Sequence, residues 1–229
     1  MPHPPATEPA VLERAPGAGG ELVLRRAGAH FEIISNGVFL MDTRNGESER
    51  LLVRTATAGL QPPARLLIGG LGVGFSLAEA LTDPAVGEVT VIEREPAVVA
   101  WHTTHLEPFS RGALRDPRVR VETTDLLDWL TTATGHYDAL CLDIDNGPDW
   151  TVTPGNARLY DATGLDLLAR RMTARGVLAV WSARAVPAFE NLLRARFTDV
   201  DVHAVPVPRG EPDVIYLART PDKTGKENV

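Results

Sequence analysis

The segment Ile68-Gly69-Gly70-Leu71-Gly72-Val73-Gly74 decides the fold of this chain. The apolar run 65–69 predicts a buried strand, and a helix is expected to follow over 74–81. A glycine-rich turn between a strand and a helix lets a ligand approach the backbone. The helix then directs free N–H groups and its positive dipole end at that ligand. This context predicts a nucleoside-binding loop with four cofactor-binding glycines: Gly69, Gly70, Gly72 and Gly74.

Short apolar runs alternate with amphipathic stretches from residue 65 onward, which is typical of βαβ units and a mostly parallel sheet. Strands are expected at 65–69, 88–93, 119–122, 137–143, 176–181, 200–205 and 214–218. Helices are expected at 74–81, 96–106, 126–131, 157–174 and 186–196. Only a Pro/Gly loop separates the last two strands, so we expect a hairpin at the sheet edge. The pattern predicts an α/β, Rossmann-like class I methyltransferase fold with a mostly parallel seven-stranded sheet and a C-terminal β hairpin.

A small antiparallel β unit is predicted ahead of this sheet. Residues 21–42 alternate in polarity, and Asn36-Gly37 indicates a hairpin because a tight two-residue turn needs positive φ at both positions. A helix is expected over 48–58. We therefore divide the chain into a flexible Pro/Gly-rich lead, an N-terminal β unit with a helix, a Rossmann-like domain and a flexible tail. These segments span 1–20, 21–60, 61–220 and 221–229.

Composition narrows the classes of function. The 229 residues, 44% of them hydrophobic, suffice for one α/β domain with a small appendage. A net charge of −7 disfavours nucleic-acid and anionic membrane partners, which need a positive surface. The single cysteine, Cys141, excludes an intrachain disulfide. With no signal pattern and no run of about 20 apolar residues, we predict a cytoplasmic protein that acts on small molecules.

Two acidic residues stand at the ends of strands next to the glycine loop. Glu93 ends the second strand, where its carboxylate could bind ribose hydroxyls or lie at the surface. Asp125 follows the third strand and could accept the adenine amine or cap the next helix, a role for which Thr124 competes. Because ligands of open α/β sheets bind at the carboxyl ends of strands, we predict Glu93 and Asp125 as cofactor-binding residues.

A series of short motifs extends from about residue 22 to residue 218: Leu67-Ile68-Gly69-Gly70, Val91-Ile92-Glu93, Asp116-Pro117-Arg118-Val119, Tyr137-Asp138-Ala139-Leu140-Cys141-Leu142-Asp143 and Gly176-Val177-Leu178. In order and spacing they resemble the spermidine synthase family of polyamine synthases. The resemblance implies an N-terminal β unit, an adenosyl donor, and an aspartate-bearing loop after the fourth strand. The resemblance also implies that residues 61–220 form an adenosyl-binding catalytic domain.

Three positions depart from the family pattern. The family's Gly-Gly-Gly-Asp-Gly loop uses its aspartate to hold the donor amine, and Gly72 stands there in this chain. Residues 47–50 (Glu-Ser-Glu-Arg) replace a Tyr-Gln-Glu motif, and Asn146 replaces the second aspartate of Asp-Ser-Ser-Asp-Pro. Each lost charge-assisted contact costs a polyamine roughly 1.5–3 kcal/mol. We therefore favour methyl transfer from S-adenosylmethionine, with aminopropyl transfer from decarboxylated S-adenosylmethionine as the alternative.

The loop after the fourth strand carries the candidate catalytic residues. Transfer from a sulfonium is an in-line displacement that depends mainly on positioning, with a base needed only for a protonated nucleophile. Asp143 could orient or deprotonate the acceptor, or cap its loop. Asp145 has a similar claim because alternate residues of an extended segment face the same way.

Four further residues are candidates for contact with the acceptor. Trp150 lies in the loop 146–155, a candidate lid, and could stack on a substrate or anchor the loop. Tyr160 could contact the substrate or face the core. Arg184 could pair with a substrate carboxylate or a nearby acid. Glu49 is one of several acids that would permit an amine acceptor.

Metal binding is not predicted, because His102 and His105 share a helix face but lack a carboxylate to complete a site. Three functions stay open: a small-molecule methyltransferase, an aminopropyltransferase, and a non-catalytic nucleoside-binding oligomer. An NAD-dependent oxidoreductase is more distant. A homodimer is expected through the edge of the N-terminal β unit.

Overall fold

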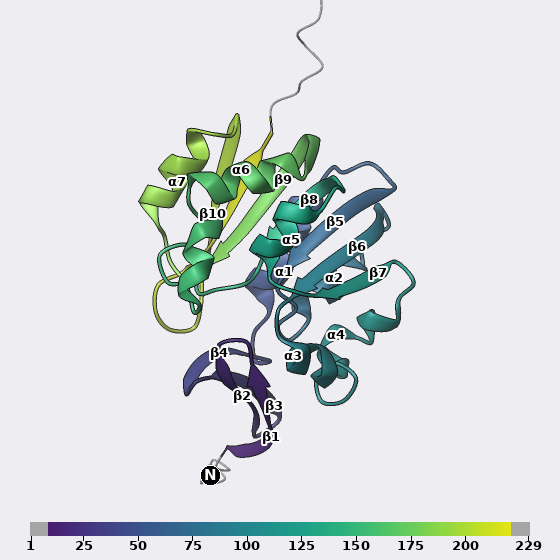
Figure 1. The fold of residues 1–229 in the computed structure, drawn as a ribbon, viewed down its shortest axis with the longest axis vertical. Helices are drawn as coiled ribbons and strands as arrows, with labels where there is room; N and C mark the ends of the chain where they lie inside the picture. Colours follow the sequence, from purple (N-terminus) through teal and green to yellow (C-terminus); the bar gives the residue numbers. More distant parts are fainter. Residues whose placement is uncertain (1–8, 221–229) are drawn as a thin grey trace, which may run out of the picture.

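The computed structural model describes residues 9–220, which form a small antiparallel sheet and a larger α/β unit (Figure 1). The small sheet contains β1 (Ala10–Gly17), β2 (Gly20–Ala27), β3 (His30–Ser35) and β4 (Val38–Asp42) in that spatial order. The turn between β3 and β4 has φ of 49° at Asn36 and 79° at Gly37, which confirms the predicted hairpin.

Strand β1 corrects the predicted flexible lead, because residues 10–17 of that segment are ordered. They pair with β2 along their length, and Leu12 and Ala15 pack against the core. Pro16 is tolerated because β1 is an edge strand, where a missing N–H costs no ladder bond. The rest of the prediction, for residues 1–8 and for the tail 221–229, lies outside the described residues.

The large sheet has the predicted seven strands in the order β10-β11-β9-β8-β5-β6-β7. The parallel strands are β5 (Ala64–Gly69), β6 (Val86–Glu93), β7 (Val119–Thr123), β8 (Tyr137–Leu142) and β9 (Met172–Ser182). The predicted hairpin is formed by β10 (Asp199–Val205) and β11 (Asp213–Arg219), and β11 runs antiparallel to both its neighbours. The chain passes from β5 to β6 and β7 on one side, and then crosses to β8 on the other side of β5, which makes the carboxyl end of β5 a topological switch point.

Helices cover both faces of this sheet (Figure 1). They are α1 (Glu47–Thr57), α2 (Phe75–Ala80), α3 (Pro96–Trp101), α4 (Glu107–Ser110), α5 (Leu126–Thr132), α6 (Ala162–Arg170) and α7 (Pro187–Arg194), with 3-10 turns η1 (Ala113–Arg115) and η2 (Pro154–Leu159). Neighbouring residues of β5 alternate between two hydrophobic clusters, Leu66 and Ile68 in one and Leu67 in the other.

No helix in the described part of the chain is long and apolar enough to cross a membrane.

Two predicted helices are shorter than expected. The helix predicted over 96–106 ends at Trp101, and a turn leads into α4, which has a proline in its first turn. The helix predicted over 157–174 is divided because Asp161 caps a new helix by accepting from the Gly164 N–H at 2.9 Å. At its other end Met172 already pairs with Tyr137 as the first residue of β9. Strand pairing therefore ends the helix early.

Candidate functional site

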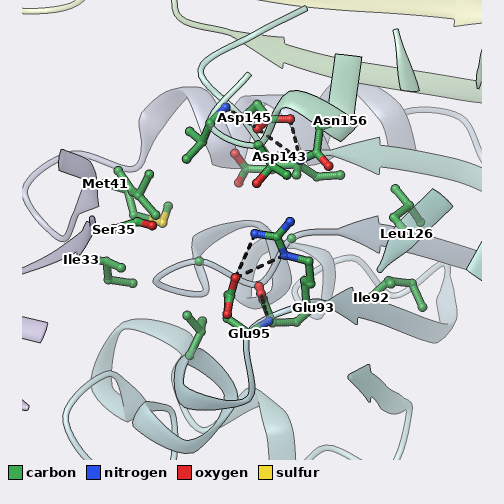
Figure 2. A pocket seen from close by; sticks show the side chains of 18 of the residues that line it. Ile33, Ser35, Met41, Ile92, Glu93, Glu95, Leu126, Asp143, Asp145 and Asn156 are labelled. Carbon is green, nitrogen blue, oxygen red and sulfur yellow. Dashed lines mark hydrogen bonds and ion pairs between the residues drawn. The ribbon is translucent and has the colours of Figure 1, made fainter. Parts of the chain in front are cut away.

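A pocket lies at the carboxyl ends of the parallel strands, between the large sheet and the N-terminal sheet. Figure 2 shows Asp143 and Asp145 on one side, Glu93 and Glu95 facing them across the pocket, and apolar side chains at the two ends. Of the predicted site residues, those that line it are Glu49, Gly70, Gly72, Glu93, Asp125, Asp143 and Asp145. Gly69, Gly74, Trp150, Tyr160 and Arg184 are not among its lining residues.

The glycine loop forms the floor of the pocket where β5 meets β8. Gly70 has φ of +91°, and a side chain there would collide with the backbone carbonyl of Asp143. The loop thus needs a residue without Cβ so that the ends of the two strands approach each other. Below the loop, His102 Nε2 lies 2.9 Å from the Gly72 carbonyl, and burial lowers the pKa of this histidine. His102 therefore supports the loop.

Glu93 is buried, with 8% of its surface exposed, so it is no surface acid. Its carboxylate accepts hydrogen bonds of 2.8 Å from the backbone N–H groups of Leu71 and Glu95. Burial raises its pKa. Asp125 caps α5 through bonds from the N–H groups of Leu127, at 2.8 Å, and Asp128, at 3.4 Å. Because Asp125 also lines the pocket, capping and ligand contact are compatible there.

Three carboxylates lie close together: Asp143 after β8 and Glu49 in α1, which line the pocket, and Asp213 at the start of β11, which lies next to them outside the lining. Burial and the neighbouring Asp143 raise the pKa of Glu49 to about 8. Burial and the charge of Asp213 raise the pKa of Asp143 to about 6, although a hydrogen bond of 2.9 Å from Ser76 Oγ acts to lower it. Burial also raises the pKa of Asp213. Among the described residues, no basic side chain forms an ion pair with any of these three acids.

A serine connects two members of this carboxylate cluster. Ser48 Oγ lies 3.1 Å from Glu49 Oε2 and 2.7 Å from Asp213 Oδ2. The Ser48 hydroxyl has one proton to donate, so it can serve only one of the two carboxylates at a time. Its bond to Glu49 lowers the pKa of that group, but burial and the charge of Asp143 outweigh it. Sequence reasoning missed Asp213. The signal for it is topological, because a strand antiparallel to its neighbours begins at the edge where the parallel strands end.

Asp145 is held by its own loop. It accepts hydrogen bonds from the Val152 N–H at 2.9 Å, from Asn156 Nδ2 at 3.0 Å and from the Tyr160 hydroxyl at 3.4 Å. Through these contacts Asp145 stabilises the loop after β8. Tyr160 is buried and packs its ring edge-on against Phe189, as its core interpretation predicts.

The remaining candidates lie away from the pocket. Trp150 is 52% exposed. Arg184 forms a surface ion pair of 3.0 Å with Asp149, which agrees with the alternative that it pairs with a nearby acid. His105 lies 3.2 Å from Glu13. No group of potential metal ligands is found among the described residues.

The N-terminal sheet supplies an apolar wall that the sequence did not reveal. Leu22, Ile33, Leu40 and Met41 line the pocket from β2, β3 and β4. The sheet is fixed there by hydrogen bonds from the Ala18 N–H to Glu95, 2.8 Å, and from Trp101 Nε1 to Glu13, 2.9 Å. The N-terminal β unit is therefore part of the site.

Known proteins place this arrangement in a family. No family model matches the chain. It is 35% identical over 133 residues to polyamine aminopropyltransferase 1 of Streptomyces coelicolor, covering 57% of this chain and 24% of that protein. It is 30% identical over 165 residues to the polyamine aminopropyltransferase of Mycobacterium tuberculosis, covering 70% of this chain and 30% of that protein. The chain belongs to the spermidine synthase family.

The fold of this chain is similar to that of a solved spermidine synthase in complex with the transition state analogue AdoDATO. The TM-score is 0.78 at 15% identity, over 95% of this chain and 76% of the other. The resemblance stated from the sequence and the predicted fold class are thus both confirmed. The chain spans about a quarter to a third of the length of the curated relatives named above.

Proposed function

We propose that this chain transfers an aminopropyl group from decarboxylated S-adenosylmethionine to an amine acceptor. The observation that carries the proposal is the carboxylate cluster beside the glycine loop, whose members Glu49, Asp143 and Asp213 have no basic partner in the described structure. Partly buried carboxylates without an ion-pair partner favour a cationic ligand, and Arg94 in the lining of the pocket pairs with Glu95 instead. The names of the relatives point the same way.

The adenosyl half of the donor fits the other side of the pocket. Glu93 has lone pairs left to accept from ribose hydroxyls after its two backbone bonds. Asp125 uses Oδ1 for both capping bonds, so its second oxygen is available to an adenine amine. Ile92 and Leu126 offer apolar surface for the base (Figure 2). These roles are part of the proposal.

The charge of the donor discriminates between the two transfer reactions. The decarboxylated donor carries a sulfonium and an ammonium, and both are attracted by the cluster. S-adenosylmethionine adds a carboxylate, which the ionised Asp143 repels and for which a protonated Glu49 offers no counter-charge. The cluster therefore favours aminopropyl transfer over the methyl transfer that the sequence led us to prefer.

Asp143 is the residue best placed to assist the chemistry. The acceptor nitrogen attacks the propyl carbon next to sulfur, the C–S bond breaks, and its electron pair stays on sulfur to leave a neutral thioether. The nitrogen must lose a proton, and a carboxylate with a pKa of about 6 is a suitable acceptor near neutral pH. Asp145 acts indirectly in this scheme, by holding the loop that follows Asp143.

Incubation of the purified chain with each donor and a linear aliphatic diamine tests this function. We expect 5′-methylthioadenosine to form from the decarboxylated donor, and Asp143→Asn to abolish its formation. Asp149→Asn, a matched change in the exposed ion pair with Arg184, should leave the rate unchanged. Formation of S-adenosylhomocysteine from S-adenosylmethionine, with no 5′-methylthioadenosine from the other donor, would establish methyl transfer instead.

A further inference from the structure

Met41 occupies the space that a side chain at position 72 would need. Gly72 has φ of +50°, and a Cβ added there would lie 2.5 Å from the Met41 sulfur and 2.6 Å from its Cε. Real Cβ atoms do not approach other heavy atoms so closely, so one of the two residues would have to move. Where the family carries an acid this chain has Gly72, and the thioether of Met41 from β4 fills the space beside it.

The position of Met41 is fixed by the N-terminal sheet. Met41 lies on β4 opposite Ile33 of β3, and both side chains line the pocket. In Figure 2 they lie at the end of the pocket opposite Leu126 and Ile92. Ile33 is 1% exposed and belongs to the main core cluster. The strand that carries Met41 is held by this core, so a larger residue at position 72 requires the end of the Met41 side chain to turn away and the backbone at φ +50° to accept a side chain.

We propose that Met41 determines donor specificity by presenting an apolar surface over Gly72. This inference rests on the proposed aminopropyl transfer. The propyl chain of the donor contacts the thioether of Met41, and its ammonium is held by Glu49 and Asp143 alone. Restoring a carboxylate at this wall should then raise the preference for a donor with an ammonium over a neutral adenosyl thioether.

Calorimetric titration of Met41→Glu and Met41→Gln tests this role without altering Gly72. The two side chains have nearly the same size, so only the charge differs between them. The measured quantity is the ratio of the Kd values for 5′-methylthioadenosine and decarboxylated S-adenosylmethionine. We expect Met41→Glu to raise this ratio about tenfold or more over Met41→Gln, which should stay near the wild-type ratio. An equal ratio in both variants would overturn the proposal.

A second set of variants tests the steric part and covers a failure of Met41→Glu to fold. Gly72→Asp should weaken binding of 5′-methylthioadenosine through the contact with Met41 and through backbone strain at φ +50°, and Met41→Ala in the same chain should restore the part that is due to the contact. Losses that simply add in the double variant would contradict the inference. Both experiments measure binding only. Coupling between positions 41 and 72 in a protein without transfer activity would therefore refute the proposed function and leave only the effect of Met41 on ligand binding standing.

Discussion

Replacement of Glu49 by glutamine should remove most of the pH dependence of donor binding. Burial and the charge of Asp143 raise the pKa of Glu49 to about 8 from its ordinary value of 4.5, so the free protein holds Glu49 largely protonated at neutral pH. The ammonium of the donor pairs with the ionised form. Asp143, whose pKa is about 6, is already ionised at neutral pH and contributes little further change above it.

The size of the effect follows from the ionised fraction of Glu49. With a pKa of about 8 this fraction is roughly one tenth at about pH 7 and roughly three quarters at about pH 8.5. An apparent Kd equals the intrinsic Kd divided by the fraction of the competent form. The affinity of the wild-type chain for decarboxylated S-adenosylmethionine should therefore rise about eightfold over this interval.

Isothermal titration at several pH values measures this rise directly. Glu49→Gln should show a nearly flat profile, whereas Glu47→Gln, a matched change at an exposed residue of the same helix, should keep the wild-type profile. Neutral 5′-methylthioadenosine should bind with little pH dependence in all three proteins. A wild-type profile that is flat, or that survives in Glu49→Gln, would refute the assignment of the raised pKa to Glu49.

The same shift has an effect on stability whose sign is fixed. A carboxyl whose pKa is raised by folding stabilises the fold below its unfolded pKa, and this contribution is lost as the pH rises through the folded value. The melting temperature of the ligand-free wild-type chain should accordingly fall as the pH rises from about 4.5 toward about 8. The fall should be smaller in Glu49→Gln.

Three further predictions concern other parts of the structure. Glu93→Gln should weaken binding of 5′-methylthioadenosine about tenfold or more in calorimetry, because that carboxylate holds the glycine loop and, in the proposed site, accepts from the ribose. Asp145→Asn should lower the free energy of unfolding by about 1–3 kcal/mol in urea titrations and speed proteolysis within residues 146–156. Leu24→Ala, at a fully buried site of the N-terminal sheet, should cost about 2–5 kcal/mol in the same titration, whereas exposed Val38→Ala should change it by less than about 0.5 kcal/mol.

The strands of the large sheet were predictable because local sequence determines them. Each is a short apolar run between glycines, prolines or polar turns, and the structure moves their ends by only a few residues. The Asn36-Gly37 turn was equally local. The helix predicted over 157–174 failed at its end because the chain from Met172 pairs with Tyr137, a partner 35 residues earlier. Periodicity carries no information about such a partner.

The site was predictable where it depends on the ends of strands. Glu93, Asp125 and Asp143 follow three parallel strands, so topology brings them to one edge. Met41 and Asp213 could not be found in this way. Met41 reaches the pocket only through the docking of the N-terminal sheet, and Asp213 only because β11 runs against its neighbours.

The preference for methyl transfer shows why aligned positions are a poor measure of a site's charge. Compared position by position, the chain lacks the family's acids at Gly72 and Asn146, and a cationic substrate seemed to lose its partners. In three dimensions Glu49 and Asp213 lie near Asp143, on elements distant in sequence, so that three carboxyl groups gather there and can ionise around a cationic substrate. The field at a substrate depends on where carboxylates lie in space. An aligned motif records only one way of placing them, so a departure at Gly72 by itself does not exclude aminopropyl transfer.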